Sequence, residues 1–189
     1  MMQNLFRMLT LIYAHPYPLH SRVNRALRQA VDGLSGIRTR DLYALYPDFH
    51  IDVAAEQSAL AESETIVLQH PMRWYHTPAL LSLWFEKVLA YGWAYGHDGA
   101  GQHARALQGK RLLWAVTAGG SQTAYSASGY NQHTVHEMAA PIRQTALYCG
   151  MEWLEPHVLY GTGQLDAVAL ARAAQDYRGR LVQLLGEKA

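Results

Sequence analysis

Residues 9–24 read LTLIYAHPYPLHSRVN, and this one stretch contains a strand, a loop and the start of a helix. Residues 9–14 are almost continuously apolar, which is typical of a strand buried on both faces of a parallel sheet. The prolines of the following loop end the strand, and Ser21 is expected to cap the next helix. Apolar residues then recur every three or four positions from Val23 to Leu34, which predicts an amphipathic helix.

The rest of the chain repeats this alternation of short apolar runs and helical periodicity. Further strands are expected at residues 37–42, 65–70, 111–117 and 152–160, with helices at 52–61, 78–88, 133–148 and 166–184. Residues 91–109 lack periodicity and are rich in Gly, His and Tyr, which predicts a long surface excursion. The alternation predicts an α/β fold, a three-layer sandwich around a five-stranded parallel sheet of order 2-1-3-4-5. The length of 189 residues suits a single domain over residues 1–189.

The composition argues against two classes of protein and indicates a compartment. The formal net charge is +1 and 16% of the residues are charged, so we expect no concentrated basic face of the kind that binds nucleic acid. No run approaches the roughly 18 apolar residues of a membrane span, so any membrane association would be peripheral. The one cysteine, Cys149, cannot form an intramolecular disulfide, which favours a reducing compartment and a buried, inert thiol.

In a sheet of this order, ligands bind beyond the carboxyl ends of the strands, where the winding reverses. The loops after the first, third and fourth strands should therefore meet. The first loop contains His15 and leads through Ser21, Arg22, Val23 and Asn24 into a helix. Free N–H groups and the helix dipole favour an anion such as a phosphate at that position. A plain capping role for Ser21 is an equally open interpretation.

The second and third loops suit the remaining parts of a planar cofactor. Trp74 and Tyr75 follow a buried strand directly and can stack on a flat ring, although a Trp more often belongs to a core. Gly119 and Gly120 allow the backbone to approach a ligand and donate N–H bonds, or they form a plain tight turn. An anion site, a ring site and backbone donors at the ring's polar edge together indicate a flavin nucleotide.

Several motifs along the chain match one known family. They are IYAHPYP at 12–18 with His20, Ser21 and Asn24, LYPDF at 45–49 with Ile51 and Asp52, QHPM at 69–72 with Trp74 and Tyr75, GWAYG at 92–96, Thr117 with Gly119 and Gly120, and YCG at 148–150. From about residue 9 to residue 160 the chain resembles the flavodoxin-like NAD(P)H:quinone oxidoreductases. The closer likeness is to their bacterial branch, the ancillary proteins of the glutathione-regulated potassium-efflux systems.

The resemblance implies a bound flavin, FMN or FAD, that passes hydride from NADH or NADPH to a quinone. It also implies a homodimer with active sites at the subunit interface and a cytoplasmic location. Members of this branch dock on the cytoplasmic face of a membrane potassium-efflux protein and activate it. The residues that the resemblance assigns to the flavin are His15, Ser21, Arg22, Val23 and Asn24 on the phosphate side, Met72, Arg73, Trp74 and Tyr75 along the ring, and Thr117, Ala118, Gly119 and Gly120 at its polar edge.

The loop after the double glycine departs from the family pattern. Quinone reductases place a Tyr and then a His there. Tyr125 matches the Tyr, whereas the His position falls at Asn131, with His133 just beyond. We expect Tyr125 and, if the loop is shifted, His133 to bond the quinone oxygen and aid its protonation. We expect no metal site, since no carboxylate or cysteine set completes the i, i+3 pair His133 and His136.

Two rival functions use the same residues differently. A regulatory module would use its flavin and nicotinamide sites to switch a membrane channel, with weak turnover and tight partner binding. A one-electron carrier would present an acidic docking surface, which 16 basic against 15 acidic residues argue against.

Overall fold

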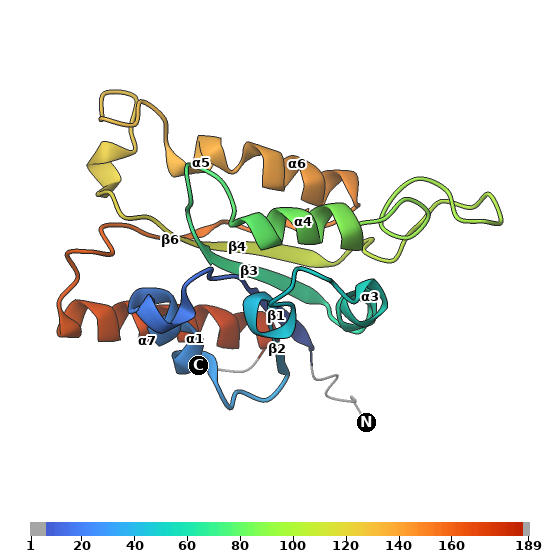
Figure 1. Cartoon of the computed structure of the whole chain (residues 1–189), viewed down its shortest axis with the longest axis horizontal. Coiled ribbons are helices and arrows are strands. Elements are labelled where there is room, and N and C mark those ends of the chain that lie inside the picture. Colours follow the sequence, from blue (N-terminus) through green and yellow to red (C-terminus); the bar gives the residue numbers. More distant parts are fainter. Residues whose placement is uncertain (1–6, 187–189) are drawn as a thin grey trace.

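The computed structural model describes residues 7–186, so residues 1–6 and 187–189 of the expected domain lie outside the described residues (Figure 1). Its sheet follows the path β2-β1-β3-β4-β5, with every neighbouring pair parallel, which confirms the predicted strand order. The strands of the central path are β1 (Leu9–Tyr13), β2 (Ile37–Asp41), β3 (Thr65–Pro71) and β4 (Arg111–Thr117).

The predicted fifth strand is divided into two short strands. β5 (Glu152–Trp153) pairs with the start of β4, and β6 (His157–Leu159) pairs with its end, so the sheet has six strands rather than five. The Leu154 N–H still bonds to the Leu112 carbonyl at 2.9 Å. Pro156 then lacks an N–H to donate, which interrupts the ladder at this edge of the sheet.

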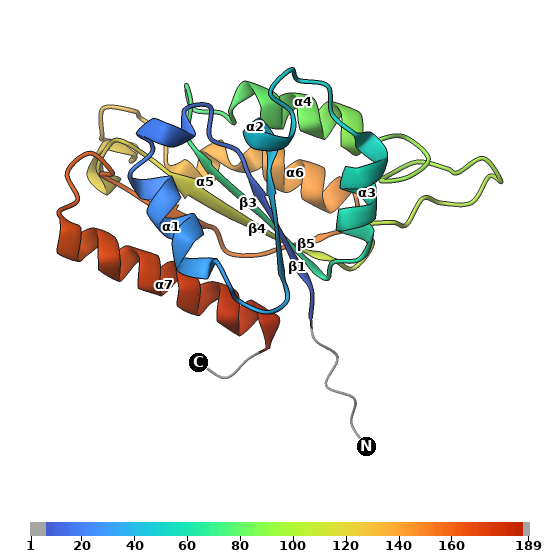
Figure 2. The ribbon, with the colours of Figure 1, turned by 60° about the horizontal axis from the view of Figure 1, so that its bottom comes forward.

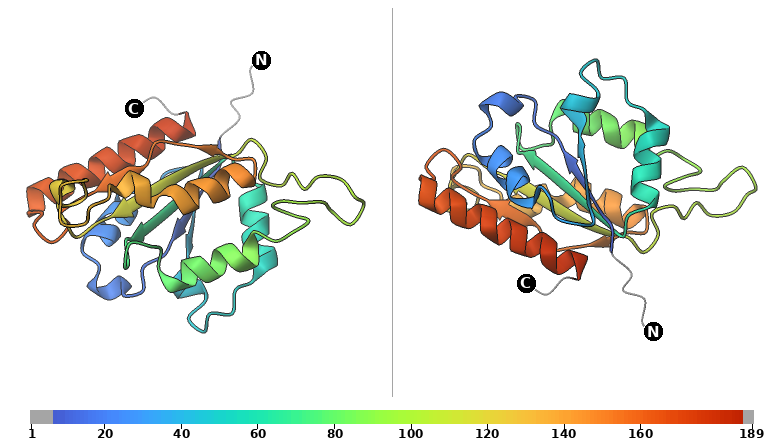
Figure 3. Two further views of the ribbon diagram at one scale, coloured as in Figure 1. Left: turned by 90° about the horizontal axis from the view of Figure 1, so that it is seen from above. Right: turned by 90° about the horizontal axis from the view of Figure 1, so that it is seen from below.

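Helices cover both faces of the sheet, as Figures 2 and 3 show. One face carries α1 (Val23–Val31) and the long α7 (Ala167–Leu185), whose buried residues form one apolar core with Leu11 and Val67. The other face carries α3 (Val53–Ala61), α4 (Ala79–Val88) and α6 (Ala140–Tyr148), which enclose a second core. This arrangement is the expected three-layer sandwich.

Local sequence explains most helix ends and two departures from expectation. Asp52 and Asp166 cap α3 and α7 through their carboxylates, as their positions predict. Asp41 likewise caps a short unpredicted helix, α2 (Leu42–Leu45), so β2 ends one residue early. The helix expected at 133–148 is two helices, α5 (Val135–Met138) and α6, because Pro141 suits only a first helical turn.

Residues 91–109 form the expected excursion, which extends away from the sheet beyond the end of α4 (Figure 1). Two single-turn helices, η1 (Pro18–His20) and η2 (Gln122–Ala124), lie in loops. Cys149 is buried, as expected. Within the described residues, no helix combines the length and the apolar character needed to cross a membrane.

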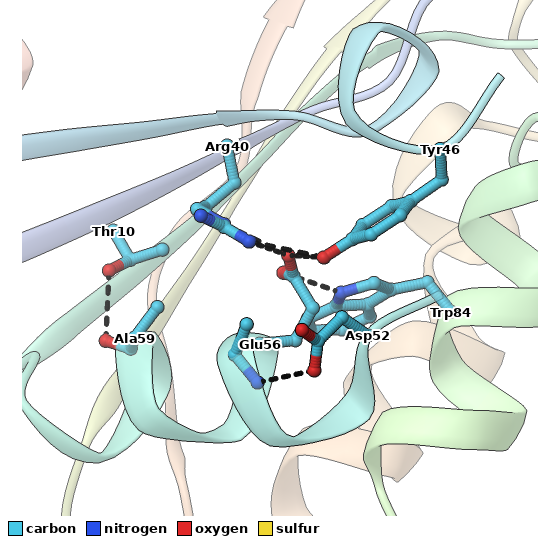
Figure 4. Close-up of polar contacts among 8 residues, drawn as sticks. Thr10, Arg40, Tyr46, Asp52, Glu56, Ala59 and Trp84 are labelled. Carbon is cyan, nitrogen blue, oxygen red and sulfur yellow. Dashed lines mark hydrogen bonds and ion pairs between the residues drawn. The ribbon is translucent and has the colours of Figure 1, made fainter. Parts of the chain in front are cut away.

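A buried carboxylate joins three elements of the second core, as Figure 4 shows. Glu56 of α3 is fully buried and accepts hydrogen bonds from Arg40 of β2, from the Tyr46 hydroxyl at 2.7 Å and from Trp84 Nε1 of α4 at 2.9 Å. Burial, followed by the bond to Glu56, raises the pKa of Tyr46 to about 12. We call Arg40, Tyr46, Glu56 and Trp84 the Glu56 cluster. The LYPDF motif therefore has a structural role through Tyr46.

Candidate functional site

Three loops meet at the carboxyl edge of the sheet because three strands end there side by side. Tyr13 at the end of β1 is in register with Gln69 of β3, and Pro71 at the end of β3 is in register with Thr117 of β4. The predicted convergence of the loops after β1, β3 and β4 is therefore confirmed. We refer to this region, residues 14–24, 71–77 and 117–125, as the three-loop rim.

A cavity of about 390 Å³ opens between the first and third loops. It is lined by His15, His20, Ser21, Arg22, Val23, Asn24, Pro71, Thr117, Thr162, Gly163 and Leu165. All five residues predicted for the phosphate side of a flavin thus share one cavity with Thr117. The segment after β6, residues 161–165, is an additional wall that sequence reasoning missed, because nothing local in it indicates a ligand.

The floor of this cavity is a buried chain of hydrogen bonds. The Asn24 amide donates to Thr117 Oγ1 at 2.7 Å, and Gln69 Nε2 donates to the Asn24 carbonyl at 2.9 Å. The Tyr177 hydroxyl of α7 donates to Gln69 Oε1 at 3.1 Å. All four side chains are at most 5% exposed. Gln69 and Tyr177 were not expected at the site, although a Gln inside a buried strand was an available signal.

The start of α1 differs from expectation and leaves donors facing the cavity. Arg22, not Ser21, stands at the N-cap position, and no side chain caps the helix. Because no side chain caps the helix, its first-turn N–H groups have no intrahelical partner and remain available to an anion. Ser21 is buried in the cavity wall. The Arg22 guanidinium donates to the carbonyls of Thr162 and Leu165 and so ties the 161–165 segment across the cavity.

The second loop contains a strained turn. The backbone N–H and carbonyl groups of Arg73 and His76 bond reciprocally at 2.9 Å, and the two residues between them, Trp74 and Tyr75, have φ values of 48° and 64°. Positive φ at both central positions is the geometry that normally selects Asn-Gly. Trp74 is nevertheless 90% exposed and Tyr75 49% exposed, so packing does not explain these residues. A strained backbone that presents aromatic side chains to solvent is typical of a functional site.

The first and second loops touch through charged and aromatic groups. The Arg73 guanidinium lies 5.8 Å from the centre of the Tyr17 ring. His15 Nδ1 accepts a bond from the Tyr17 N–H at 3.1 Å, and burial, followed by the nearby Arg73 charge, lowers the pKa of His15. Met72 is half-buried against the core, and its N–H donates to the Thr117 carbonyl at 2.8 Å, which ties the second loop to the third.

In the third loop, the two glycines leave backbone donors open next to the end of β4. The Ala118 N–H bonds to the Leu159 carbonyl at 2.9 Å and its carbonyl accepts from Thr162, so buried Ala118 contributes no free donor. Among the described residues, neither Gly119 nor Gly120 donates its N–H to an acceptor of the chain. A Cβ added at Gly119 would meet nothing within 4 Å, which shows open space beside that backbone.

The predicted proton donors lie beyond the glycines. The Tyr125 ring packs on Tyr160, with ring centres 5.9 Å apart, and burial raises the Tyr125 pKa. His133 lines a second cavity of about 610 Å³ together with Tyr75, Tyr130, Asn131, Gln132 and Met138. The Tyr75 hydroxyl donates to Asn131 Oδ1 at 3.1 Å, and both residues line this cavity together with His133. His133 also lies 3.8 Å from Glu137.

Directly beneath the rim, His70 of β3 is fully buried with a fixed tautomer. Trp114 Nε1 donates to His70 Nε2 at 2.7 Å, so the proton of the neutral ring sits on Nδ1, which donates to the Pro71 carbonyl at 3.0 Å. Burial lowers the pKa of His70 to about 4. His70 therefore fixes the strand end that leads into the second loop.

The rim has the parts that a phosphorylated flavin requires. A helix start without a side-chain cap provides anion donors, and exposed Trp74 and Tyr75 provide aromatic surface. Gly119 and Gly120 provide N–H groups that no described residue accepts, with open space beside Gly119. The individual contacts of the predicted residues with a flavin stay a prediction.

Comparison with known proteins places the chain among relatives with this architecture. The family of the flavodoxin-like fold matches residues 8–181. The glutathione-regulated potassium-efflux system ancillary protein KefF of Klebsiella pneumoniae (strain 342) is 49% identical over 175 residues, covering 93% of this chain and 95% of that protein.

Two solved structures extend the comparison. General stress protein 14 of Treponema denticola, in complex with FMN, has a TM-score of 0.87 at 34% identity and covers 94% of this chain and 99% of its own. An NADPH-quinone reductase from P. pentosaceus has a TM-score of 0.82 at 26% identity, covering 92% and 96%. The chain belongs to the flavodoxin-like quinone reductase family, in the branch of the potassium-efflux ancillary proteins.

Proposed function

We propose that this chain is a flavin-dependent NAD(P)H:quinone oxidoreductase that acts as a single domain and holds FMN in the three-loop rim. One observation carries the proposal: three features meet at one edge of the sheet. They are a helix start without a side-chain cap, an exposed aromatic turn, and two glycine N–H groups that no described residue accepts. FMN is favoured over FAD because a 34% identical relative is described with FMN, and the cavity beside α1 suits a terminal phosphate.

The bound flavin would supply the two-electron chemistry between NADH or NADPH and a quinone. The chain's own part is to bind and polarise. The α1 N-terminus, Ser21 and Asn24 would receive the phosphate, and the Trp74–Tyr75 turn would hold the ring plane. The N–H groups of Gly119 and Gly120 would stabilise negative charge at the polar edge of the ring, as preorganised dipoles do in oxyanion holes.

The cavity at Tyr75 would receive the quinone. Its walls combine aromatic surface from Tyr75 and Tyr130 with polar groups from Asn131 and His133. Tyr125 remains protonated at neutral pH and can donate a hydrogen bond to a quinone oxygen. His133 would then provide the exchangeable proton, since it is exposed and paired with Glu137.

A second function, regulation of a potassium-efflux protein, is favoured by a specific observation. A 49% identical relative that the chain covers over 95% of its length is named as an ancillary protein of such a system. We propose that a homodimer of this chain, in the cytoplasm and peripheral to the inner membrane, docks on such a partner. Turnover and docking are compatible in one protein.

The absorption spectrum of the purified protein tests the cofactor. We expect a yellow protein whose extracted chromophore is FMN, and NADH or NADPH should bleach it until a quinone is added. A preparation that stays colourless after incubation with FMN would contradict the proposal. Turnover without capture of an efflux protein would support the enzyme alone, and capture without turnover would support the regulator alone.

A further inference from the structure

The surface excursion contains a β-hairpin that the proposed function does not use. The Asp98 N–H donates to the Gln102 carbonyl at 2.7 Å, and the Ala104 N–H donates to the Gly96 carbonyl at 2.9 Å. His97 and His103 form the antiparallel bridge between these two bonds. They are therefore a non-hydrogen-bonded pair, the arrangement in which opposite Cα atoms approach to about 4.5 Å and side chains lie closest on one face.

The two imidazole rings are already adjacent. Their centres are 4.4 Å apart with an interplanar angle of 34°, and both residues are exposed. Ring centres at this separation are close enough for two imidazoles to share one ion through metal–nitrogen bonds of about 2.0–2.1 Å, once the exposed rings turn a nitrogen toward it. Neither ring makes a hydrogen bond or ion pair with another described residue, so no competing contact within residues 7–186 has to break.

The hairpin tip holds this pair in place. Asp98 Oδ1 accepts from the Ala100 N–H at 2.9 Å and from the Gln102 N–H at 2.8 Å, and the Gly101 N–H bonds to the Asp98 carbonyl. The Asp98 carboxylate therefore organises the turn. Within residues 7–186, no set of three or more His, Cys, Asp or Glu side chains forms a larger ligand group. Any ion bound here would keep open positions for water.

We propose that His97 and His103 form a two-imidazole site for a divalent transition-metal ion, with Cu²⁺ bound more tightly than Zn²⁺. Imidazole nitrogen suits both ions, and copper forms the stronger complexes of the two with such ligands. The open positions of the ion would lie beside a cavity of about 460 Å³ that His103 also lines. An isolated two-stranded hairpin is marginally stable in water, so an ion joining its strands would also order the excursion.

Titration of the untagged full chain with Cu²⁺ and Zn²⁺ tests the proposal independently of flavin binding. We expect one saturable site per chain by calorimetry and, for Cu²⁺, an electron paramagnetic resonance spectrum with splitting from two nitrogens. His97→Ala and His103→Ala should each weaken binding by roughly tenfold or more, and the double variant should abolish the site. The matched control is His50→Gln, which removes an exposed histidine outside the hairpin and should bind as the parent does.

Circular dichroism establishes that each variant is folded, which is expected because His97 and His103 are exposed and belong to neither core. The proposal is overturned if the parent shows no saturable binding up to about 0.1 mM metal. A dissociation constant above that order of magnitude would be too weak for a specific site. The proposal is equally overturned if the folded double variant binds either ion with the parent's affinity and stoichiometry.

Discussion

The Glu56 cluster and the three-loop rim are both polar, but they differ in how far the chain satisfies its own hydrogen bonds. Every polar group that faces Glu56 has found its partner inside the protein: Arg40, Tyr46 and Trp84 all donate to one carboxylate. At the rim, the floor of Asn24, Gln69 and Thr117 is also satisfied, but the α1 start and the two glycines keep N–H groups without acceptors among the described residues. The difference separates polar groups that hold a fold together from polar groups that are open to a ligand.

The strongest test of this comparison removes the acceptor of the satisfied region. Glu56→Ala would take the carboxylate partner from the half-buried Arg40 charge and from two further donors, so the free energy of unfolding should fall by about 3 kcal/mol. Urea unfolding measures the loss. The matched control is Glu62→Gln, which breaks a surface pair with Arg38 and should leave the midpoint almost unchanged. An unaltered urea midpoint for Glu56→Ala would show that the Glu56 cluster does not stabilise the fold.

A second test uses pH on His70, which belongs to the satisfied class although it lies beneath the rim. Its pKa in the folded chain is about 4, against 6.5 for an unperturbed histidine, so the unfolded chain binds the extra proton first. Stability should therefore be complete above pH 6.5 and fall as the pH drops toward 4, by roughly 3 kcal/mol. Urea midpoints measured across this range should show a flatter slope for His70→Phe than for the parent. Equal slopes would mean that His70 does not govern this loss.

The unsatisfied region is tested by removing one donor. Gly119→Pro deletes an N–H group that has no acceptor within residues 7–186, so flavin affinity should fall about tenfold, the effect of one hydrogen bond of about 1.4 kcal/mol. Gly119→Ala is the matched control, because it keeps the N–H and its methyl group meets nothing within 4 Å. Flavin fluorescence quenching measures both affinities. Similar affinities for the two variants would show that the N–H is not a flavin donor.

The smallest expected effect concerns the strained turn, where stability and binding should change in opposite directions. Trp74→Gly relieves a positive φ that costs an ordinary residue about 1–2 kcal/mol, offset by about 0.5–1 kcal/mol of chain entropy. The flavin-free protein should therefore gain up to about 1 kcal/mol in urea unfolding while flavin binding weakens. Trp74→Ala removes the same ring without relieving the backbone and should show only the weaker binding. A stability gain for both variants would show that the exposed Trp74 ring, and not the positive φ of its backbone, destabilises the protein.

The sequence predicts those parts of the fold that depend on neighbouring residues. The order of the sheet follows from apolar runs and helical periodicity, and the Asp52 and Asp166 caps follow from local chemistry. The rim was predictable because strand ends of a parallel sheet must meet. The break at Pro156 and the division of the 133–148 helix at Pro141 were also marked in the sequence, since a proline cannot donate an N–H.

Contacts between distant residues had no such signal. Ser21 has the residue type and position of a helix cap, yet it is buried in the cavity wall and Arg22 stands at the N-cap. Tyr177 bonds to a residue 108 positions earlier, and Arg22 ties a segment 140 positions later. The pairing of His97 with His103 depends on which hairpin register forms, which residue types alone do not fix.

The hydrogen-bond chain beneath the cavity has a consequence for biosynthesis. It links residue 24 to residue 177, so the cavity floor is in place only after residue 177 has been made. A ribosome-bound chain that lacks α7 would expose Gln69 and one face of the sheet to water. If FMN binds as proposed, the floor of its cavity is complete only once α7 has docked, and a chain truncated before Tyr177 should bind FMN weakly.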